Sequence, residues 1–125
     1  MRFRAESHLR RPAEFAKVRA SGRRYHCGGF VLWAAHRPAP SEGTPPAPTG
    51  PRAGFVASKA AVGNAVARNR AKRRLREVFR HHQSLVPMDM DLILQARRSL
   101  NRLEYAEIER KFLKACADLF PARSI

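Results

Sequence analysis

A strongly basic segment in the middle of the chain also carries a regular set of apolar residues, and this combination constrains the fold most. On a helix, at about 100° per residue, the apolar side chains fall in one sector roughly a third of the circumference wide. They are Ala67, Ala71, Leu75, Val78 and Phe79. The pattern predicts a helix over about residues 64–82 that packs one side on a core and leaves a cationic surface on the other.

The charges of this segment favour contact with a polyanion. Seven basic residues lie between Arg68 and Arg80, and the only acid among them is Glu77. A solvated helix face, which is the alternative interpretation, usually mixes acidic and basic residues that support each other. Like charges at this density repel one another unless phosphates neutralise them. We therefore expect this surface to bind nucleic acid.

The composition narrows the class of protein. The chain has 125 residues and a formal net charge of +15, which suits one domain with a phosphate-rich partner. It has no apolar run of about 20 residues, and its first residues lack the apolar core of a signal peptide. Cys27 and Cys116 lie far apart in no paired motif, which predicts free thiols in a reducing, cytoplasmic environment.

Periodicity and turn residues predict the order helix, strand, strand, helix, strand, helix, which indicates an α+β fold with helices packed on a small sheet. The expected ranges are 12–21, 25–35, 54–58, 64–82, 90–97 and 104–120. Asn64 is the expected N-cap of the basic helix, and residues 59–63 are expected to form a turn. Residues 37–52 hold six prolines and predict a flexible loop within a single domain of residues 1–125.

The first predicted strand has two distinct faces. Strand alternation places Val31 and Trp33 on one face, and Phe30 and Leu32 on the other, which we assign to the core. Two glycines at positions 28 and 29 precede this run and indicate a bulge or a close approach by another part of the chain.

The central block resembles the signature of the bacterial ribonuclease P protein subunit. The residues that carry the resemblance are Gly54-Phe55-x-x-Ser58-Lys59, then Val62-Gly63-Asn64-Ala65-Val66-x-Arg68-Asn69-Arg70-x-Lys72-Arg73-Arg74-Leu75-Arg76-Glu77. The first helix, the Phe30–Trp33 strand, the 91–97 strand and the last helix follow in the family's order. The chain departs from the family at Arg19, where an aromatic residue is frequent, at Ala60, where a second lysine is frequent, and at Ala57, where valine is common.

The resemblance implies a fold and a role. The fold is a small two-layer α/β sandwich, similar to domain 2 of ribosomal protein S5, with a left-handed βαβ crossover. The role is to bind the catalytic RNA of ribonuclease P and the 5′ leader of precursor tRNA, and so to promote endonucleolytic removal of the leader. The resemblance also implies that the RNA subunit carries the chemistry, that the protein alone binds no cofactor, and that Mg²⁺ acts in the holoenzyme.

The candidate residues for contact with the catalytic RNA lie on or beside the basic helix. They are Lys59, Asn64, Arg68, Asn69, Arg70, Lys72, Arg73, Arg74 and Arg76. The arginines and lysines can each neutralise a phosphate, and the Asn69 amide can bond a base edge, a ribose hydroxyl or a metal-bound water. Asn69 could instead bond the local backbone, and Lys59 could be a solvated lysine at a strand end.

A second set of candidates defines a cleft for the single-stranded leader. These residues are Phe15, Arg19, Val31, Trp33 and Arg97. An aromatic ring on an open sheet stacks unpaired bases without demanding a sequence, and arginine can stack as well. The alternative is that Phe15 and Trp33 belong to the core.

No residues of the chain suggest a nuclease site made by the protein itself. The sequence has no carboxylate cluster for two metals and no histidine pair placed for acid–base catalysis, and we interpret Asp89 and Asp91 as structural. A general RNA-binding or ribosomal protein without a role in cleavage remains the alternative function.

Overall fold

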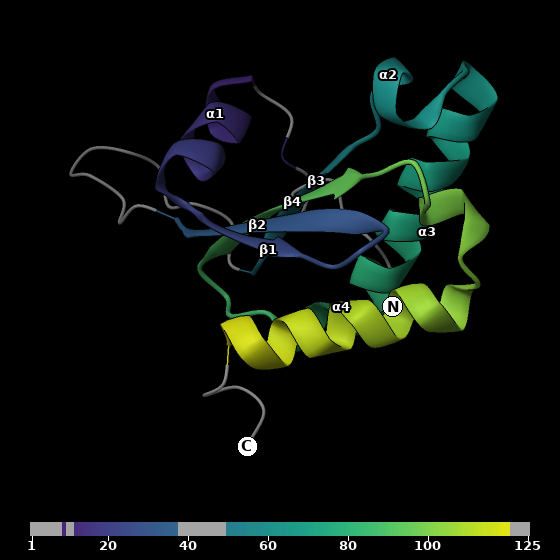
Figure 1. Cartoon of the computed structure of the whole chain (residues 1–125). Coiled ribbons are helices and arrows are strands. Elements are labelled where there is room, and N and C mark those ends of the chain that lie inside the picture. Colours follow the sequence, from purple (N-terminus) through teal and green to yellow (C-terminus); the bar gives the residue numbers. More distant parts are fainter. Residues whose placement is uncertain (1–8, 10–11, 38–49, 121–125) are drawn as a thin grey trace.

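The computed structural model describes Leu9, residues 12–37 and residues 50–120. In this part of the chain a four-stranded sheet lies between α1 on one face and α3 and α4 on the other (Figure 1). The strands are β1 (Arg23–His26), β2 (Phe30–His36), β3 (Arg52–Val56) and β4 (Met90–Ala96). The helices are α1 (Pro12–Ser21), α2 (Lys59–Val62), α3 (Ala65–His82) and α4 (Tyr105–Leu119), with short 3₁₀ turns η2 (Gln83–Leu85) and η3 (Leu100–Arg102).

The sheet mixes antiparallel and parallel pairing. The strand order is β1-β2-β4-β3, with β1 antiparallel to β2 and β2 antiparallel to β4. β3 runs parallel to β4, and the chain between them passes through α2 and α3. The α+β class is therefore confirmed, with the basic helix in the connection between two parallel strands.

The prediction of a single strand over residues 25–35 is wrong, because this segment forms a β-hairpin. Gly28 has a φ of 92°, a conformation that side-chain-bearing residues rarely adopt, and the Cys27 N–H donates to the Phe30 carbonyl at 2.9 Å. The two glycines therefore turn the chain, and β1 becomes an extra edge strand. The observed order is α–β–β–β–α–α–β–α.

Two other boundaries differ near the basic helix. Residues 59–63, predicted to be a turn, contain α2, because the Ser58 hydroxyl caps the Ala61 N–H at 3.1 Å. Ser58 therefore lies outside β3, which begins two residues earlier than predicted, at Arg52.

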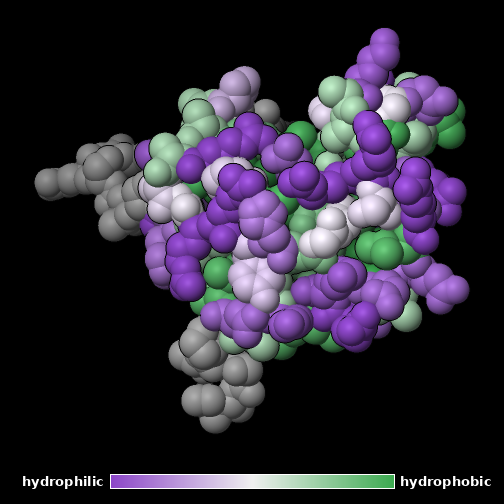
Figure 2. Space-filling model, viewed as in Figure 1, coloured by the Kyte–Doolittle hydropathy of each residue, from purple (hydrophilic) through white to green (hydrophobic). Residues whose placement is uncertain are grey.

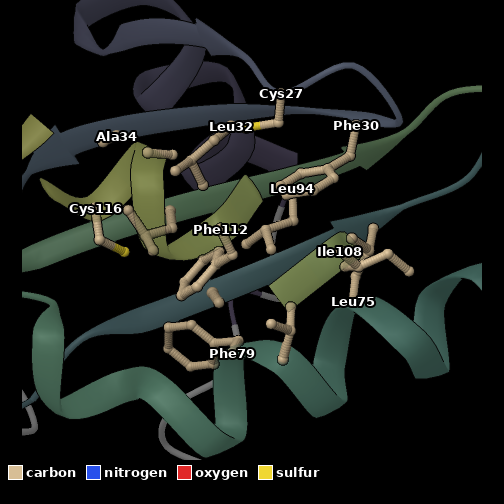
Figure 3. Packing of buried hydrophobic residues seen from close by; sticks show 14 of the residues in the cluster. Cys27, Phe30, Leu32, Ala34, Leu75, Phe79, Leu94, Ile108, Phe112 and Cys116 are labelled. Carbon is tan, nitrogen blue, oxygen red and sulfur yellow. The ribbon is translucent and has the colours of Figure 1, made fainter. Parts of the chain in front are cut away.

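The main core fills the space between one sheet face and the two long helices. Phe30 and Leu32 lie in it as predicted, with Leu94 of β4 beside them. Figure 3 shows Phe79 of α3 and Phe112 of α4 pointing into the same cluster. All five side chains are completely buried, and burial of each contributes about 1.5–3 kcal/mol.

A smaller cluster lies on the other face of the sheet, beneath α1. Its buried members are Leu9, Val18, Ala35 and Ile93, with Phe15, Trp33 and Val56 packed against it while half-buried. A β-carbon at Gly54 would lie 2.4 Å from two carbons of the Phe15 ring. Glycine in β3 is therefore what allows the Phe15 ring to lie directly against the strand.

An ion network joins both ends of the proline-rich segment to the sheet. Asp91 is the one buried charged residue in the described chain, and it accepts hydrogen bonds from Arg52 at 2.8 and 2.9 Å and from Arg37 at 3.2 Å. Arg52 also donates to Glu14 of α1 at 2.7 Å. Arg37 and Arg52 therefore have fixed positions, contrary to the prediction that they belong to a flexible loop; residues 38–49 lie outside the described residues.

Asp89 has a simpler structural role in the same region. Its carboxylate contacts the His36 ring at 3.0 Å, and this hydrogen bond lowers the pKa of Asp89. Together with the network around Asp91, this contact agrees with the interpretation of both aspartates as structural.

Candidate nucleic-acid interface

The basic helix forms as the sequence predicts. The Asn64 side chain caps it by accepting from the Ala67 N–H at 2.9 Å, and the buried residues of α3 are Ala71, Leu75, Val78 and Phe79. Ala67 is only half-buried, at the end of the apolar stripe. The stripe docks on the sheet and holds the remaining surface of α3 outward.

The predicted RNA-contact residues differ in exposure along this surface. The exposed members are Lys59, Asn64, Asn69, Arg70 and Arg73, and the half-buried members are Arg68, Lys72, Arg74 and Arg76. Because Asn64 uses its side-chain oxygen as the helix cap, only its amide nitrogen remains as a donor to a ligand.

Arg74 lies against the protein rather than pointing into solvent. Its guanidinium donates to the Leu100 carbonyl at 2.8 Å and to the Leu103 carbonyl, which ties the η3 turn to α3. Burial, followed by repulsion from Arg70, lowers the pKa of Arg74. No local pattern indicates these carbonyl partners, which lie 26 and 29 residues away along the chain.

Two arginines on this surface have a buried nitrogen without a partner. The Nε atoms of Arg68 and Arg76 are both shielded from solvent and lack a hydrogen bond within the described chain. The Arg76 guanidinium also lies 5.5 Å from the centroid of the Phe55 ring, which holds its stem against the sheet.

The two ends of α3 differ in how their charges are paired. At the C-terminal end, Glu77 contacts Arg80 at 2.9 Å and His81 at 3.2 Å, and these contacts lower the pKa of Glu77, with Arg80 as the largest cause. His82 contacts Glu109 of α4 at 2.8 Å. From Arg68 to Arg76, by contrast, no residue forms an ion pair with a described acid. Excess positive charge is therefore concentrated in the first two-thirds of the helix.

The predicted leader cleft is only partly assembled by the fold. Trp33 and Phe15 both contact the small cluster under α1, and Val31 is buried on the same sheet face. Arg19 is exposed in the last turn of α1, and Arg97 is exposed just after β4. The structure thus brings Phe15 and Trp33 together and leaves Arg19 and Arg97 at the margins.

Trp33 has a neighbour that the sequence did not suggest. The Arg24 guanidinium lies 5.5 Å from the centroid of the indole ring, because β1 pairs Arg24 directly opposite Trp33. The indole Nε1 is buried and has no acceptor among the described residues. Only recognition of the β1–β2 hairpin would have predicted this pairing.

An open pocket lies at the end of β4, near α2. Its volume is about 380 Å³, and its lining residues are Ala61, Gln95, Ala96, Arg97 and Arg98. The Arg97 N–H donates to the Gly29 carbonyl at 3.0 Å, which fixes this pocket beside the hairpin turn. Arg97 therefore lies beside both the hairpin turn and α2.

Three other kinds of site bear on function: reactive thiols, metal-binding clusters and membrane-spanning helices. Cys27 and Cys116 are buried free thiols, and burial raises the pKa of each to about 12. The described residues hold no group of three or more His, Cys, Asp or Glu side chains that could bind a metal ion. None of the described helices is long and apolar enough to cross a membrane.

The fold and the interface define a small α+β protein that exposes a polycationic helix, unpaired from Arg68 to Arg76 with described acids, beside a partly covered sheet face. A family model described as Ribonuclease P matches residues 3–119. The chain belongs to the ribonuclease P protein component family.

Individual relatives agree with this assignment. The chain is 40% identical over 110 residues to the ribonuclease P protein component of Micrococcus luteus, covering 86% of this chain and 83% of the relative. It is 34% identical over 107 residues to that of Desulfovibrio desulfuricans, covering 84% and 76%.

Solved structures show the same fold. The ribonuclease P protein of Staphylococcus aureus has a TM-score of 0.69 at 25% identity, with 90% of this chain and 94% of that chain covered. The Thermotoga maritima protein has a TM-score of 0.70 at 23% identity, with 87% and 94% covered.

Proposed function

We propose that this protein is the subunit of ribonuclease P that binds the catalytic RNA through α3 and the 5′ leader of precursor tRNA beside α1. Binding at both places promotes endonucleolytic removal of the leader, which gives the mature 5′ end of the tRNA. Membership of the ribonuclease P protein component family supports the role as a subunit of this endoribonuclease.

The unpaired charge on α3 is the observation that carries the proposal for the catalytic RNA. Arg68, Arg70 and Arg73 have no acidic partner in the described chain, whereas Arg80 on the same helix does. Unpaired cations packed on one rigid helix repel each other, and RNA phosphates that replace small counterions relieve this repulsion. The unpartnered Nε of Arg68 supports the same reading, because a buried donor gains most from an acceptor brought by a ligand.

The proposal for the leader rests on the face of the sheet beneath α1. Trp33 and Phe15 are half-buried aromatic side chains on that face, and the indole N–H has no acceptor within the described part of the chain. Unpaired bases stack on such rings at about 1–3 kcal/mol per base, largely without regard to sequence. Arg97, beside this face, can neutralise a leader phosphate.

The protein's contribution is electrostatic and positional, and we expect the RNA subunit to supply the chemistry. The protein neutralises phosphates where RNA segments converge, holds the leader, and thereby favours the productive arrangement of the substrate. We expect Mg²⁺ to act in the holoenzyme, in support of the chemistry of the RNA subunit.

The experiment that tests the role of α3 is a triple change, Arg68→Ala with Asn69→Ala and Arg70→Ala. None of the three residues belongs to the buried stripe, so the circular dichroism spectrum should be unchanged while assembly with the catalytic RNA weakens. The salt slope of binding should fall by about 1 for each lost phosphate contact.

A matched control removes the same amount of positive charge from paired positions. Arg80→Ala with Arg110→Ala also deletes two arginines, but both of these contact glutamates in the native protein. This control should assemble nearly as well as the unchanged protein. Equal losses in the two variants would mean that net charge alone, and not the α3 surface, governs assembly.

A further inference from the structure

We propose a second RNA-phosphate site in the notch between the β1–β2 hairpin and α4, where Lys111 and Lys114 bind the leader beyond the α1 side of the sheet. The proposal rests on the proposed function and extends it, because it gives the path of leader nucleotides farther from the cleavage position.

The notch is an open pocket, and two lysines of α4 form one side of it. Its volume is about 270 Å³, and its lining residues are Tyr25, His26, Cys27, Gly28, Lys111 and Lys114. The Lys111 Nζ lies 3.0 Å from the position that a β-carbon on Gly28 would occupy, so the ammonium group sits directly against the hairpin turn. The positive φ of Gly28 favours glycine at the turn, whereas the flexible end of the Lys111 side chain could move away from a β-carbon.

The cations of the notch are not neutralised by the protein. Neither Lys111 nor Lys114 forms an ion pair with an acid in the described residues, although Arg110, the neighbour of Lys111 in sequence, contacts Glu107 at 2.8 Å. Asp118 also lies on α4, and the Tyr25 hydroxyl donates to its carboxylate. That hydrogen bond is the largest cause of the rise in the pKa of Tyr25 to about 12.

The pairing of the strands places the notch at the edge of the sheet, next to the face that carries Val31 and Trp33. β1 is an edge strand, and its His26 pairs with Val31 while Arg24 pairs with Trp33. Paired residues point to the same face of a sheet, so His26 and Arg24 continue the surface of Val31 and Trp33 to the edge. Figure 2 shows hydrophilic side chains gathered over β1 and α4 on the side of the molecule that this edge occupies.

The chemistry of the notch suits phosphate rather than a base. Its aromatic residues are Tyr25, which is half-buried with its hydroxyl bound to Asp118, and His26. The lysine ammonium groups are compact charges suited to backbone phosphate. A single-stranded leader that leaves Trp33 and crosses β1 then reaches Lys111 and Lys114. The site therefore recognises the length of the leader and not its sequence.

The test compares precursor tRNAs with short and long leaders in the reconstituted holoenzyme. Lys111→Gln with Lys114→Gln should remove most of the affinity gained by lengthening the leader from about 4 to about 12 nucleotides, which spans the usual footprint of single-strand sites. The salt slope for the long-leader precursor should fall by about 0.7 per lysine. Assembly with the catalytic RNA and affinity for the short-leader precursor should stay unchanged, which also reports that the variant is folded.

The control is Arg80→Gln with Arg110→Gln, which removes the same positive charge from positions that contact glutamates. This variant should keep the affinity that the native protein gains from the longer leader. A second measurement uses the unchanged protein: a photoreactive group on a distal leader nucleotide should crosslink to α4. If the lysine variant keeps the full gain and no crosslink forms on α4, the notch is not a leader site, while the proposed function stands. If the unchanged holoenzyme shows no dependence on the leader at all, leader binding itself fails, and the notch proposal fails with it.

Discussion

The two faces of the sheet differ in how completely helices cover them. On one face, α3 and α4 enclose a large cluster in which Phe30, Phe79 and Phe112 are all fully buried. On the other face, α1 covers a cluster with four buried members, and its aromatic residues Phe15 and Trp33 stay half-buried. Figure 1 shows the same asymmetry in the ribbon, with α1 on one side of the sheet and the longer α3 and α4 on the other.

Because the two sheet faces are covered to different extents, the residues that stabilise the protein and those available to a partner lie on different faces. A closed core needs no ligand, whereas a half-covered aromatic and an unpaired arginine both gain free energy when RNA arrives. Changes on the closed face should therefore act on folding, and changes on the α1 face should act mainly on binding.

The largest expected effect is on the closed face. Phe112→Ala deletes a fully buried ring between α4 and the sheet, and should lower the free energy of unfolding by about 3–5 kcal/mol. Phe15→Ala, on the half-covered face, should cost clearly less. Urea denaturation of the two variants measures both values, and similar losses would show that the two faces contribute equally to stability.

A smaller effect is expected at the ion network beneath α1. Asp91→Asn removes the buried carboxylate that Arg37 and Arg52 share, although Arg52 keeps its contact with Glu14, and should lower the free energy of unfolding by about 1–3 kcal/mol. Asp89→Asn is the control, because its contact with His36 is solvent-exposed and should contribute less than about 1 kcal/mol. Thermal unfolding distinguishes the two variants, and an equal loss in both would argue against a special role for the buried carboxylate.

The smallest effect on stability, and the clearest on binding, is expected at Trp33. Trp33→Ala should reduce the holoenzyme's preference for precursor over mature tRNA by about 1–3 kcal/mol, because a stacked base is lost. Binding to the catalytic RNA alone should stay intact, since α3 does not depend on this side chain. Filter binding with both tRNAs measures the preference; a variant that unfolds instead would place Trp33 in the core.

Local patterns predicted the parts of the fold that depend on local chemistry. The apolar stripe of α3 and its cap at Asn64 follow from residues within the helix itself, and both are confirmed. The sequence offers the Gly28–Gly29 pair as a signal for the β1–β2 hairpin, but a bulge and a tight turn share this signal, and only the positive φ of Gly28 distinguishes them.

Contacts between distant residues could not be predicted in the same way. Arg52 and Asp91 are 39 residues apart, and nothing near either residue indicates the other. The prolines before Arg52 predict a flexible loop, although Arg52 links α1 to the sheet. The same limit hid the contact between Arg24 and Trp33, because that contact depends on the strand register.

Fluorescence of Trp33 tests the central claim most directly, because it is the only tryptophan in the chain and RNA contains none. Precursor tRNA with a leader of about 4–8 nucleotides is titrated into the holoenzyme, with mature tRNA as the matched control. The account predicts a saturable quench with the precursor and little change with mature tRNA, since only the precursor brings bases to the indole ring. Emission that stays unchanged at saturating precursor, while cleavage proceeds normally, would contradict the assignment of the half-covered face to the leader.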